Sequence, residues 1–255
     1  MKKFISNKRM SYYWGIVFLI TVWEAISLIV PQKQTIFPDP VSSVSYASTL
    51  LKSSYIYSCI LSSIWRMIAG FILALFFALC LGSLAGINDF LEGLLSPFLT
   101  MMRSVPTASF VYLFLVIAGA RLAPVFIVFL VSFPILYEGV VSGLHQIPSE
   151  VNKALSLENN RKFFNYFKIL LPMAFPSIFS AGIAAFGLSF KIEIMAEIIT
   201  GDTRSGLGCA ILAAQKNDPA NMIPVFGYSL IAVVLILVLD RILNCMKKWW
   251  LNYPL

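Results

Sequence analysis

The 255-residue sequence has too few charged side chains for a water-soluble globular protein. Asp, Glu, Lys and Arg make up 12% of the residues, whereas about 25% is usual in soluble domains. Hydrophobic residues make up 59%. This deficit of charge excludes an ordinary soluble fold, because one globular core could not bury so much apolar side chain. We therefore expect lipid to be the solvent of much of the surface.

The sequence also lacks the residues on which most enzyme classes depend. It has no Gly-x4-Gly-Lys-Ser/Thr loop, so the chain cannot bind and hydrolyse ATP by that route. The single histidine, His145, is expected in a loop. Cys59, Cys80, Cys209 and Cys245 show no metal or redox spacing. The apolar runs contain no paired Asp, Ser/His or His/Glu sets, so we expect no catalytic residue, no metal site and no cofactor bound by this chain.

Long apolar runs, by contrast, are abundant and predict membrane-spanning helices. A span needs about 20 mainly apolar residues. The runs are continuous, without the alternation typical of a barrel strand, and so favour helices. We expect an all-α polytopic membrane protein with about six transmembrane helices, forming a single domain over residues 1–255. The expected helices cover roughly residues 11–31, 57–87, 91–118, 121–143, 172–197 and 222–244.

The net charge of +7 is best explained by membrane orientation rather than by nucleic acid. With six spans, both termini and the 144–171 loop lie on one side. Basic residues are concentrated there, and positive charge marks the cytoplasmic side. We therefore expect a multi-pass protein of the cell (inner) membrane with both termini in the cytoplasm. The residues are Lys2, Lys3, Lys8, Arg9, Lys153, Arg161, Lys162, Lys168, Arg241, Lys247 and Lys248.

Glycine and other small residues predict how the helices turn and pack. Gly119-Ala120-Arg121 is expected to form a tight turn, so that the third and fourth helices pack as a hairpin. Gly82 and Gly86 stand four residues apart, and such spacing lets helix backbones approach closely. We interpret this face, which Gly70, Ala74 and Ala78 extend, as packing within the chain. A subunit interface is the alternative.

Two prolines lie inside apolar runs, and each is expected to bend or interrupt its helix. They are Pro106 and Pro134. Freed backbone groups are tolerated at membrane depth where they line a cavity or are buried. The break at Arg103–Thr107 is thus open to two interpretations, a translocation path or a structural kink.

A few charged residues fall at or near membrane depth. Arg66 is expected to extend toward the membrane surface. Glu193 and Glu197 can share a helix face, since they are four residues apart. Intramembrane charges point to function, but the same residues would also suit a wet external end of the fifth helix. Both interpretations stay open.

The 144–171 loop is a polar segment with helical character. Ser149 is a candidate N-cap, Glu150 lies in the predicted first turn, and Val151, Ala154, Leu155 and Leu157 form a modest apolar face. Asn159 is expected to stop this helix. The segment is suited either to docking into a groove of a cytoplasmic partner or to lying on the membrane surface.

The segments, in their order, resemble the permease subunits of ATP-binding-cassette (ABC) importers over nearly the whole chain. The loop is similar to the family's cytoplasmic EAA loop, with Lys153-Ala154-Leu155 at the Glu-Ala-Ala positions, Asn159 at the Gly position and Phe163 at an aromatic one. Lys153 reverses the charge of the family's Glu. Further similar segments are Ser62–Phe71, the Pro-x5-Arg-x-x-Pro run Pro97–Pro106, Phe133-Pro134-Ile135, Ala196-Glu197 and Gly206-Leu207-Gly208.

The resemblance points to the nitrate/sulfonate/taurine subgroup and to a type I importer permease fold with its core at 57–244. It implies a transport subunit that is no enzyme. Its partners would be a second permease copy, two ATPase subunits that use ATP and Mg, and an extracytoplasmic substrate-binding protein. The cargo would be a small anion such as a sulfonate, or alternatively a thiamin-precursor pyrimidine or other small heterocycle.

The resemblance also assigns candidate site residues. For ATPase coupling within the 144–171 loop it implies Glu150, Lys153, Ala154, Leu155, Leu157, Asn159 and Phe163. For the translocation path, the candidates are Arg103, Pro106, Thr107, Pro134 and Glu197. A membrane-embedded enzyme and a non-transporting membrane scaffold are the competing classes.

Overall fold

The computed structural model describes residues 2–30, 36–151, 155, 166–201 and 205–251. Within these ranges the chain forms helices and connecting turns, with no β-strand, so the expected all-α class is confirmed. The elements are α1 (Lys2–Ile29), α2 (Pro40–Leu50), α3 (Ser54–Ala85), α4 (Asp89–Ser104), α5 (Thr107–His145), the short π-helix η1 (Tyr166–Leu170), α8 (Leu171–Thr200), α9 (Leu207–Asn217) and α10 (Ile223–Leu251).

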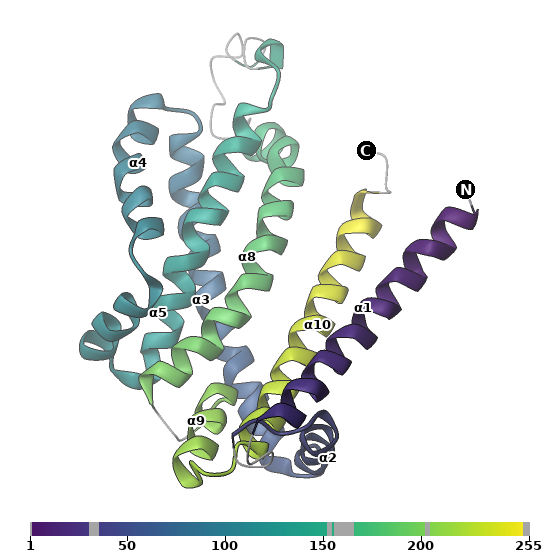
Figure 1. The fold of residues 1–255 in the computed structure, drawn as a ribbon. Coiled ribbons are helices and arrows are strands. Elements are labelled where there is room, and N and C mark those ends of the chain that lie inside the picture. Colours follow the sequence, from purple (N-terminus) through teal and green to yellow (C-terminus); the bar gives the residue numbers. More distant parts are fainter. Residues whose placement is uncertain (1, 31–35, 152–154, 156–165, 202–204, 252–255) are drawn as a thin grey trace.

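The helices run back and forth between two ends of the molecule (Figure 1). The start of α1, the end of α5 and the end of α10 lie at one end, which we name the terminal end. Helices α2 and α9 lie at the other, which we name the opposite end. An even number of crossings therefore separates the two ends of the chain, as six spans require.

The third expected helix, 91–118, is interrupted at Pro106, so the break that this proline predicted is confirmed. Val105 and Pro106 have extended backbone angles, with ψ of 131° and 126°, so α4 ends at Ser104 and α5 begins at Thr107. Pro106 lacks the N–H that would continue the helix. Four helical stretches are long and apolar enough to span a membrane among the described residues, with a shorter one at Tyr13–Ile29. They are Ser54–Ala85, Thr107–His145, Lys168–Thr200 and Ile223–Met246.

The predicted turn at Gly119 divides α5 into two arms. Gly119 has φ 76° and ψ 166°, a conformation that glycine adopts without steric cost. The rings of Phe114 and Phe126, one from each arm, stack with centroids 5.3 Å apart. The two arms thus form the expected hairpin, and residues before Gly119 complete the crossing that α4 begins (Figure 1).

The small-residue face of α3 packs against the second arm of α5, as predicted for contacts within the chain. A Cβ added at Gly70 would lie 2.5 Å from the carbonyl oxygen of Val125, and one at Gly82 would lie 2.9 Å from Cβ of Val140. Such overlaps leave no room for a side chain. The absence of side chains at these positions is therefore what allows α3 and α5 to approach closely.

Helices α5 and α8 share the most extensive interface in the described part of the chain. Gly139 and Gly143 of α5 face Ala181 and Ala174 of α8. The hydroxyls of Ser132 and Ser189 form a buried hydrogen bond of 2.8 Å between the same two helices. Together these helices form the centre of the domain, on which α3 packs from one side.

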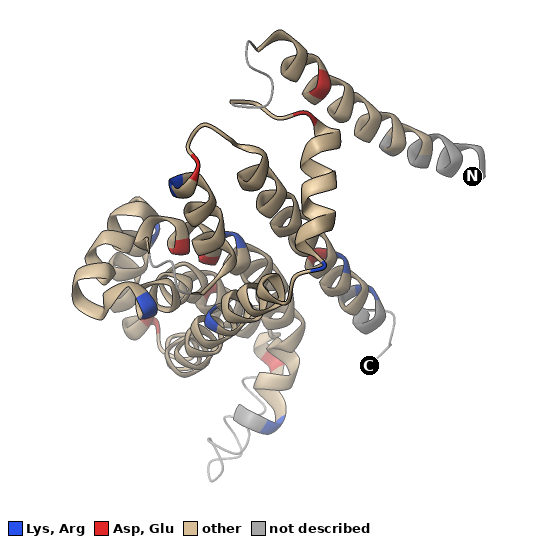
Figure 2. Cartoon of the chain, turned by 90° about the horizontal axis from the view of Figure 1, so that it is seen from below, with Lys and Arg blue, Asp and Glu red and all other residues tan. Residues whose placement is uncertain are grey.

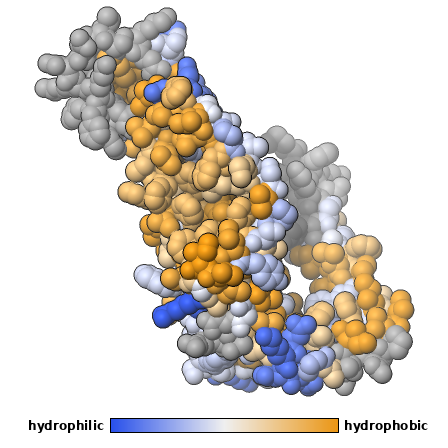
Figure 3. Space-filling model, turned by 90° about the vertical axis from the view of Figure 1, so that its left-hand side faces the viewer, coloured by the Kyte–Doolittle hydropathy of each residue, from blue (hydrophilic) through white to orange (hydrophobic). Residues whose placement is uncertain are grey.

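The outer surface is apolar where it would meet lipid. Large exposed hydrophobic side chains occur along α1, α3, α5 and α10, for example Trp65, Val116 and Leu237. Hydrophobic residues form a broad area on the face shown in Figure 3. Charged residues are sparse along the bundle (Figure 2). This distribution is that of a multi-pass membrane protein.

Helix α1 stands beside the bundle and is attached mainly at the opposite end. The indole N–H of Trp23 donates to the carbonyl of Pro38 at 3.0 Å, and its ring lies 6.0 Å from that of Phe226 in α10. Helix α2 then begins at Asp39, whose carboxylate accepts from the N–H of Ser42 at 2.9 Å. This hydrogen bond lowers the pKa of Asp39 below its ordinary value.

The α5–α8 packing predicts a position-specific cost of adding bulk. We expect Gly139→Val to destabilise the protein by about 1–3 kcal/mol, because the new side chain would overlap Cβ of Ala181. Gly182→Val is the matched control, since a Cβ there meets nothing within 4 Å. Thermal unfolding of the two purified variants in detergent checks this. Equal losses of stability would contradict the packing described.

Candidate functional site

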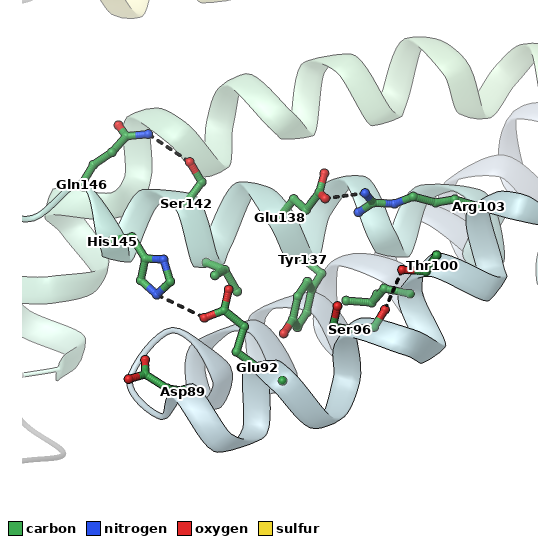
Figure 4. A pocket seen from close by; sticks show the side chains of 13 residues that line it. Asp89, Glu92, Ser96, Thr100, Arg103, Tyr137, Glu138, Ser142, His145 and Gln146 are labelled. Atoms are coloured by element: carbon green, nitrogen blue, oxygen red, sulfur yellow. Dashed lines mark hydrogen bonds and ion pairs between the residues drawn. The ribbon is translucent and has the colours of Figure 1, made fainter.

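A polar groove lies between α4 and the second arm of α5, near the terminal end (Figure 4). We name it the α4–α5 groove; its volume is about 770 Å³. Most other interhelical contacts in the described structure are apolar, so this concentration of polar side chains is unusual for the molecule. The lining residues are Asp89, Glu92, Gly93, Ser96, Leu99, Thr100, Arg103, Tyr137, Glu138, Val141, Ser142, His145 and Gln146.

The sequence of α4 explains how the helix presents polar groups to this groove. Asn88 caps the helix by accepting from the N–H of Phe90 at 3.0 Å. Asp89 and Glu92 lie in the first turn, where the helix dipole favours negative charge. Leu99 and Met102 are buried and anchor the helix to the core. One side of α4 is thus held in place while its acidic first turn borders the groove.

Arg103 crosses the groove from the last turn of α4. Its guanidinium forms an ion pair with Glu138 of α5 and also donates to the carbonyl of Pro134 at 3.2 Å. The side chains of Arg103 and Glu138 are 43% and 60% exposed, so water screens the pair and its contribution to stability is small. The ion pair neutralises the positive charge of Arg103 in the wall of the groove.

The end of the groove nearest the terminal end is formed by His145, Glu92 and Tyr137. Nε2 of His145 lies 3.4 Å from Oε2 of Glu92. His145 is the last residue of α5 and has a carboxylate beside it, so the loop position expected from the sequence is wrong. Tyr137 is 3% exposed, and its hydroxyl, directed into the groove, has no hydrogen-bond partner among the described residues.

A second polar site, the Glu197 cluster, lies near the opposite end and joins α3, α8 and α9. We define it as Ser63, Arg66, Glu197 and Ser205 with the N–H groups of Leu207 and Gly208. Glu197 is fully buried, and its carboxylate lies 2.6 Å from Nη1 of Arg66. The interpretation of Glu197 as a wet helix end is therefore incorrect.

Hydrogen bonds satisfy the buried carboxylate of Glu197 on several sides. The hydroxyl of Ser63 donates to it at 2.8 Å and accepts from the N–H of Leu207 at 2.8 Å. The N–H of Gly208 donates to it at 2.8 Å. Arg66 also donates to the Ser205 carbonyl at 2.9 Å. Glu197 thus caps α9 from another helix, where the dipole favours its charge.

The two glycines of the Gly206-Leu207-Gly208 motif are required because the start of α9 lies very close to α8. Gly206 has φ 133°, and a Cβ at this position would overlap the Glu197 carboxylate. A Cβ at Gly208 would overlap the carbonyl of Ile194. Glu193, one helical turn before Glu197, is also fully buried, and its oxygens have no hydrogen-bond partner in the described structure.

The structure separates the residues predicted for the translocation path. Arg103 and Pro134 meet in the groove, and Pro106 and Thr107 form the break between α4 and α5. Glu197 belongs to the other cluster. The sequence also suggested that Arg66 extends to the membrane surface, whereas its side chain is 12% exposed and paired.

Several groove residues were missed by sequence reasoning, namely Glu92, Tyr137 and Glu138. Glu138 falls four residues after Pro134, and this spacing on one helix was a usable signal. No signal in the sequence relates Glu92 to Tyr137, because only the turn at Gly119 brings the second arm of α5 beside α4. No group of three or more His, Cys, Asp or Glu side chains is placed to hold a metal ion among the described residues.

Most of the residues predicted for ATPase coupling lie outside the described residues. These are Lys153, Ala154, Leu157, Asn159 and Phe163. Of the remainder, Glu150 is exposed in the turn of helix that follows Pro148, and Leu155 is partly buried. The coupling role of the loop therefore stays a prediction.

Comparison with known sequences identifies related proteins. The profile of the family described as "Binding-protein-dependent transport system inner membrane component" matches residues 78–250. The bicarbonate transport system permease protein CmpB of Synechococcus elongatus is 30% identical over 75% of this chain and 68% of its own length. The nitrate import permease protein NrtB of Synechocystis is 26% identical over 92% of this chain and 86% of its own.

Comparison with solved structures supports the same fold. A chain of an amino acid ABC transporter superposes with a TM-score of 0.65 at 16% identity, covering 80% of this chain and 97% of the other. A chain of the MetNI methionine ABC transporter in an inward-facing conformation gives 0.57 at 19% identity, covering 72% and 93%. At these identities the likeness concerns the fold alone.

The buried Arg66–Glu197 pair and the exposed Arg103–Glu138 pair should differ sharply in their contribution to stability. We expect Glu197→Gln to destabilise the protein by about 3–5 kcal/mol, since it leaves the buried Arg66 without a counter-charge. Glu138→Gln, the matched control in the exposed pair, should cost about 1 kcal/mol or less. Chemical unfolding of the purified variants measures both values. Similar losses would contradict the role given to the Glu197 cluster.

Proposed function

This chain belongs to the family of binding-protein-dependent transport system inner membrane components, and we propose how it works within such a transporter. It is the permease subunit of an ABC importer, a transport component rather than an enzyme. Importers of this family work with an ATP-binding subunit and a substrate-binding protein. In our proposal two copies of this chain form the membrane path, and two ATP-binding subunits attach to it.

The proposal depends on the common position of the start of α1, the end of α5, the start of α8 and the end of α10 (Figure 1). The predicted coupling loop lies between α5 and α8, and the basic residues of the sequence are concentrated in the same segments. Positive charge favours the cytoplasmic side. We therefore place the terminal end in the cytoplasm, against the ATP-binding subunits, and the opposite end toward the substrate-binding protein.

In the proposed coupling mechanism, movement of the loop is passed to the two spans that flank it. Helix α5 enters the loop and α8 leaves it, and the two share the largest interface of the described structure. A force applied to the loop would therefore move the α5–α8 pair as a unit. Because α5 also carries Glu138 and contacts Arg103 of α4, this movement would change the width of the α4–α5 groove.

The proposed cargo is a small solute of the kind carried by the relatives. Bicarbonate and nitrate appear in the names of two relatives, and aliphatic sulfonates in that of a third, SsuC of Bacillus subtilis, which is 25% identical over 88% of this chain and 82% of its own. A small anionic or zwitterionic solute such as taurine fits this group. The substrate-binding protein would make the first selection.

One substitution in the predicted loop tests both transport and coupling. Proteoliposomes that hold the assembled transporter are tested with radiolabelled taurine, bicarbonate and nitrate, and we expect uptake of a small solute only with ATP. Ala154→Arg should abolish uptake and co-purification of the ATP-binding subunit while membrane insertion persists. A bulky charge on the predicted apolar face of the 144–171 loop would prevent that face from docking to the subunit. Ala220→Arg, at an exposed site of the opposite end, is the matched control and should retain co-purification of the ATP-binding subunit.

Two results would contradict the proposal. Undiminished co-purification of the ATP-binding subunit with Ala154→Arg would remove the coupling role from the loop. Uptake of these solutes at equal rates with and without ATP would remove the proposed energy source.

A further inference from the structure

The α4–α5 groove carries an excess of negative charge, which is unexpected beside relatives named for anions. Three carboxylates line it, those of Asp89, Glu92 and Glu138, against the single guanidinium of Arg103. That guanidinium is already engaged by Glu138 and by the carbonyl of Pro134. With His145 neutral, the formal excess is two negative charges, and both belong to the first turn of α4.

An unpartnered buried hydroxyl points to a ligand in the same place. Tyr137 is 3% exposed, and within the part of the chain that the structure describes its hydroxyl has no hydrogen-bond partner, although such groups almost always find one. In Figure 4 this hydroxyl is directed toward α4, between Glu92 and Ser96. The groove therefore offers a hydroxyl and a carboxylate side by side, both able to accept a hydrogen bond, around a space large enough for a small solute.

We infer that the α4–α5 groove is a binding subsite for a cationic nitrogen, such as the ammonium group of an amine-bearing solute, held by Glu92, Asp89 and the Tyr137 hydroxyl. An ammonium has three N–H donors and no acceptor, and the groove supplies the acceptors. A plain inorganic anion would meet repulsion there. The inference rests on the proposed function, in which the groove lies on the path of the solute, and it narrows the cargo to molecules that carry such a nitrogen.

A second cavity, at the opposite end of the molecule, has charges of the opposite sign and serves as a comparison. This smaller cavity, of about 460 Å³, is lined by Arg66 and Arg121, with Ser62 and Ser205 between α3 and the start of the second arm of α5. Its charged lining residues are cationic, and because Arg66 is already paired with Glu197, Arg121 supplies the excess positive charge. A cysteine placed in each cavity can therefore report the local sign of charge on one and the same protein.

Charge-selective labelling tests the groove without any knowledge of the cargo. Ser96→Cys and Ser62→Cys are made in the full chain with the exposed Cys80 and Cys245 replaced by serine. Each purified variant is treated with trimethylammonium-ethyl and with sulfonatoethyl methanethiosulfonate. The excess of two formal negative charges in the groove should make the cation-to-anion rate ratio at least about tenfold higher at residue 96 than at residue 62. Adding Glu92→Gln should lower the ratio at residue 96 severalfold.

Protection by small solutes tests binding itself. Taurine and isethionate differ only by an ammonium in place of a hydroxyl. We expect taurine, and not isethionate, to slow the reaction of Ser96→Cys with uncharged methyl methanethiosulfonate. Tyr137→Phe should weaken this protection at least about threefold while the charge preference in labelling stays unchanged, a combination that a merely structural role of Tyr137 would not produce.

Three outcomes would overturn the inference: equal rate ratios at residues 96 and 62, equal protection by taurine and isethionate, or no protection by taurine. None of these measurements needs ATP, the ATP-binding subunit or the substrate-binding protein. Failure here with intact ATP-dependent uptake would therefore reject the cationic subsite and leave the permease function standing. Loss of uptake with the labelling pattern intact would do the reverse.

Discussion

The packing at the opposite end of the structure depends on the contacts of one buried carboxylate, that of Glu197. A charge buried in a membrane domain is tolerated only if its partners replace water. Arg66, Ser63 and the N–H of Gly208 do so here, and they come from α3 and α9, whereas Glu197 belongs to α8. One acidic side chain therefore determines where three helices meet, and the glycines of α9 are required by its proximity.

At the terminal end, two breaks in the helices, and not a buried charge, determine how the helices are arranged. Pro106 separates α4 from α5, and Gly119 reverses the chain, so that α4 lies beside the second arm of α5 and not in line with it. This arrangement leaves the polar α4–α5 groove between them. A buried, hydrogen-bonded ion pair joins the helices at the opposite end, whereas the groove keeps exposed charges and a hydroxyl that has no partner in the described structure. This difference suits a protein that holds one end fixed and changes the other.

Local patterns predicted the helices well and the polar sites poorly, for a physical reason. Apolar runs, the Gly119 turn and the small-residue face of α3 depend on neighbours close in sequence or on one helix face. Glu197 and Arg66 are 131 residues apart, and no periodicity relates them. Glu92 and His145 meet only because of the hairpin. Membrane-depth charges were correctly singled out, but their partners required the three-dimensional arrangement.

The central claim is that docking of the loaded substrate-binding protein at the opposite end is coupled to ATP hydrolysis by the ATP-binding subunits at the terminal end. The most direct measurement is the ATP hydrolysis rate of the assembled transporter in lipid nanodiscs, with and without the loaded substrate-binding protein. The account predicts that the loaded protein raises hydrolysis several-fold, and that Ala154→Arg removes this response. An unchanged rate of hydrolysis on addition of the loaded protein to the intact assembly would contradict it.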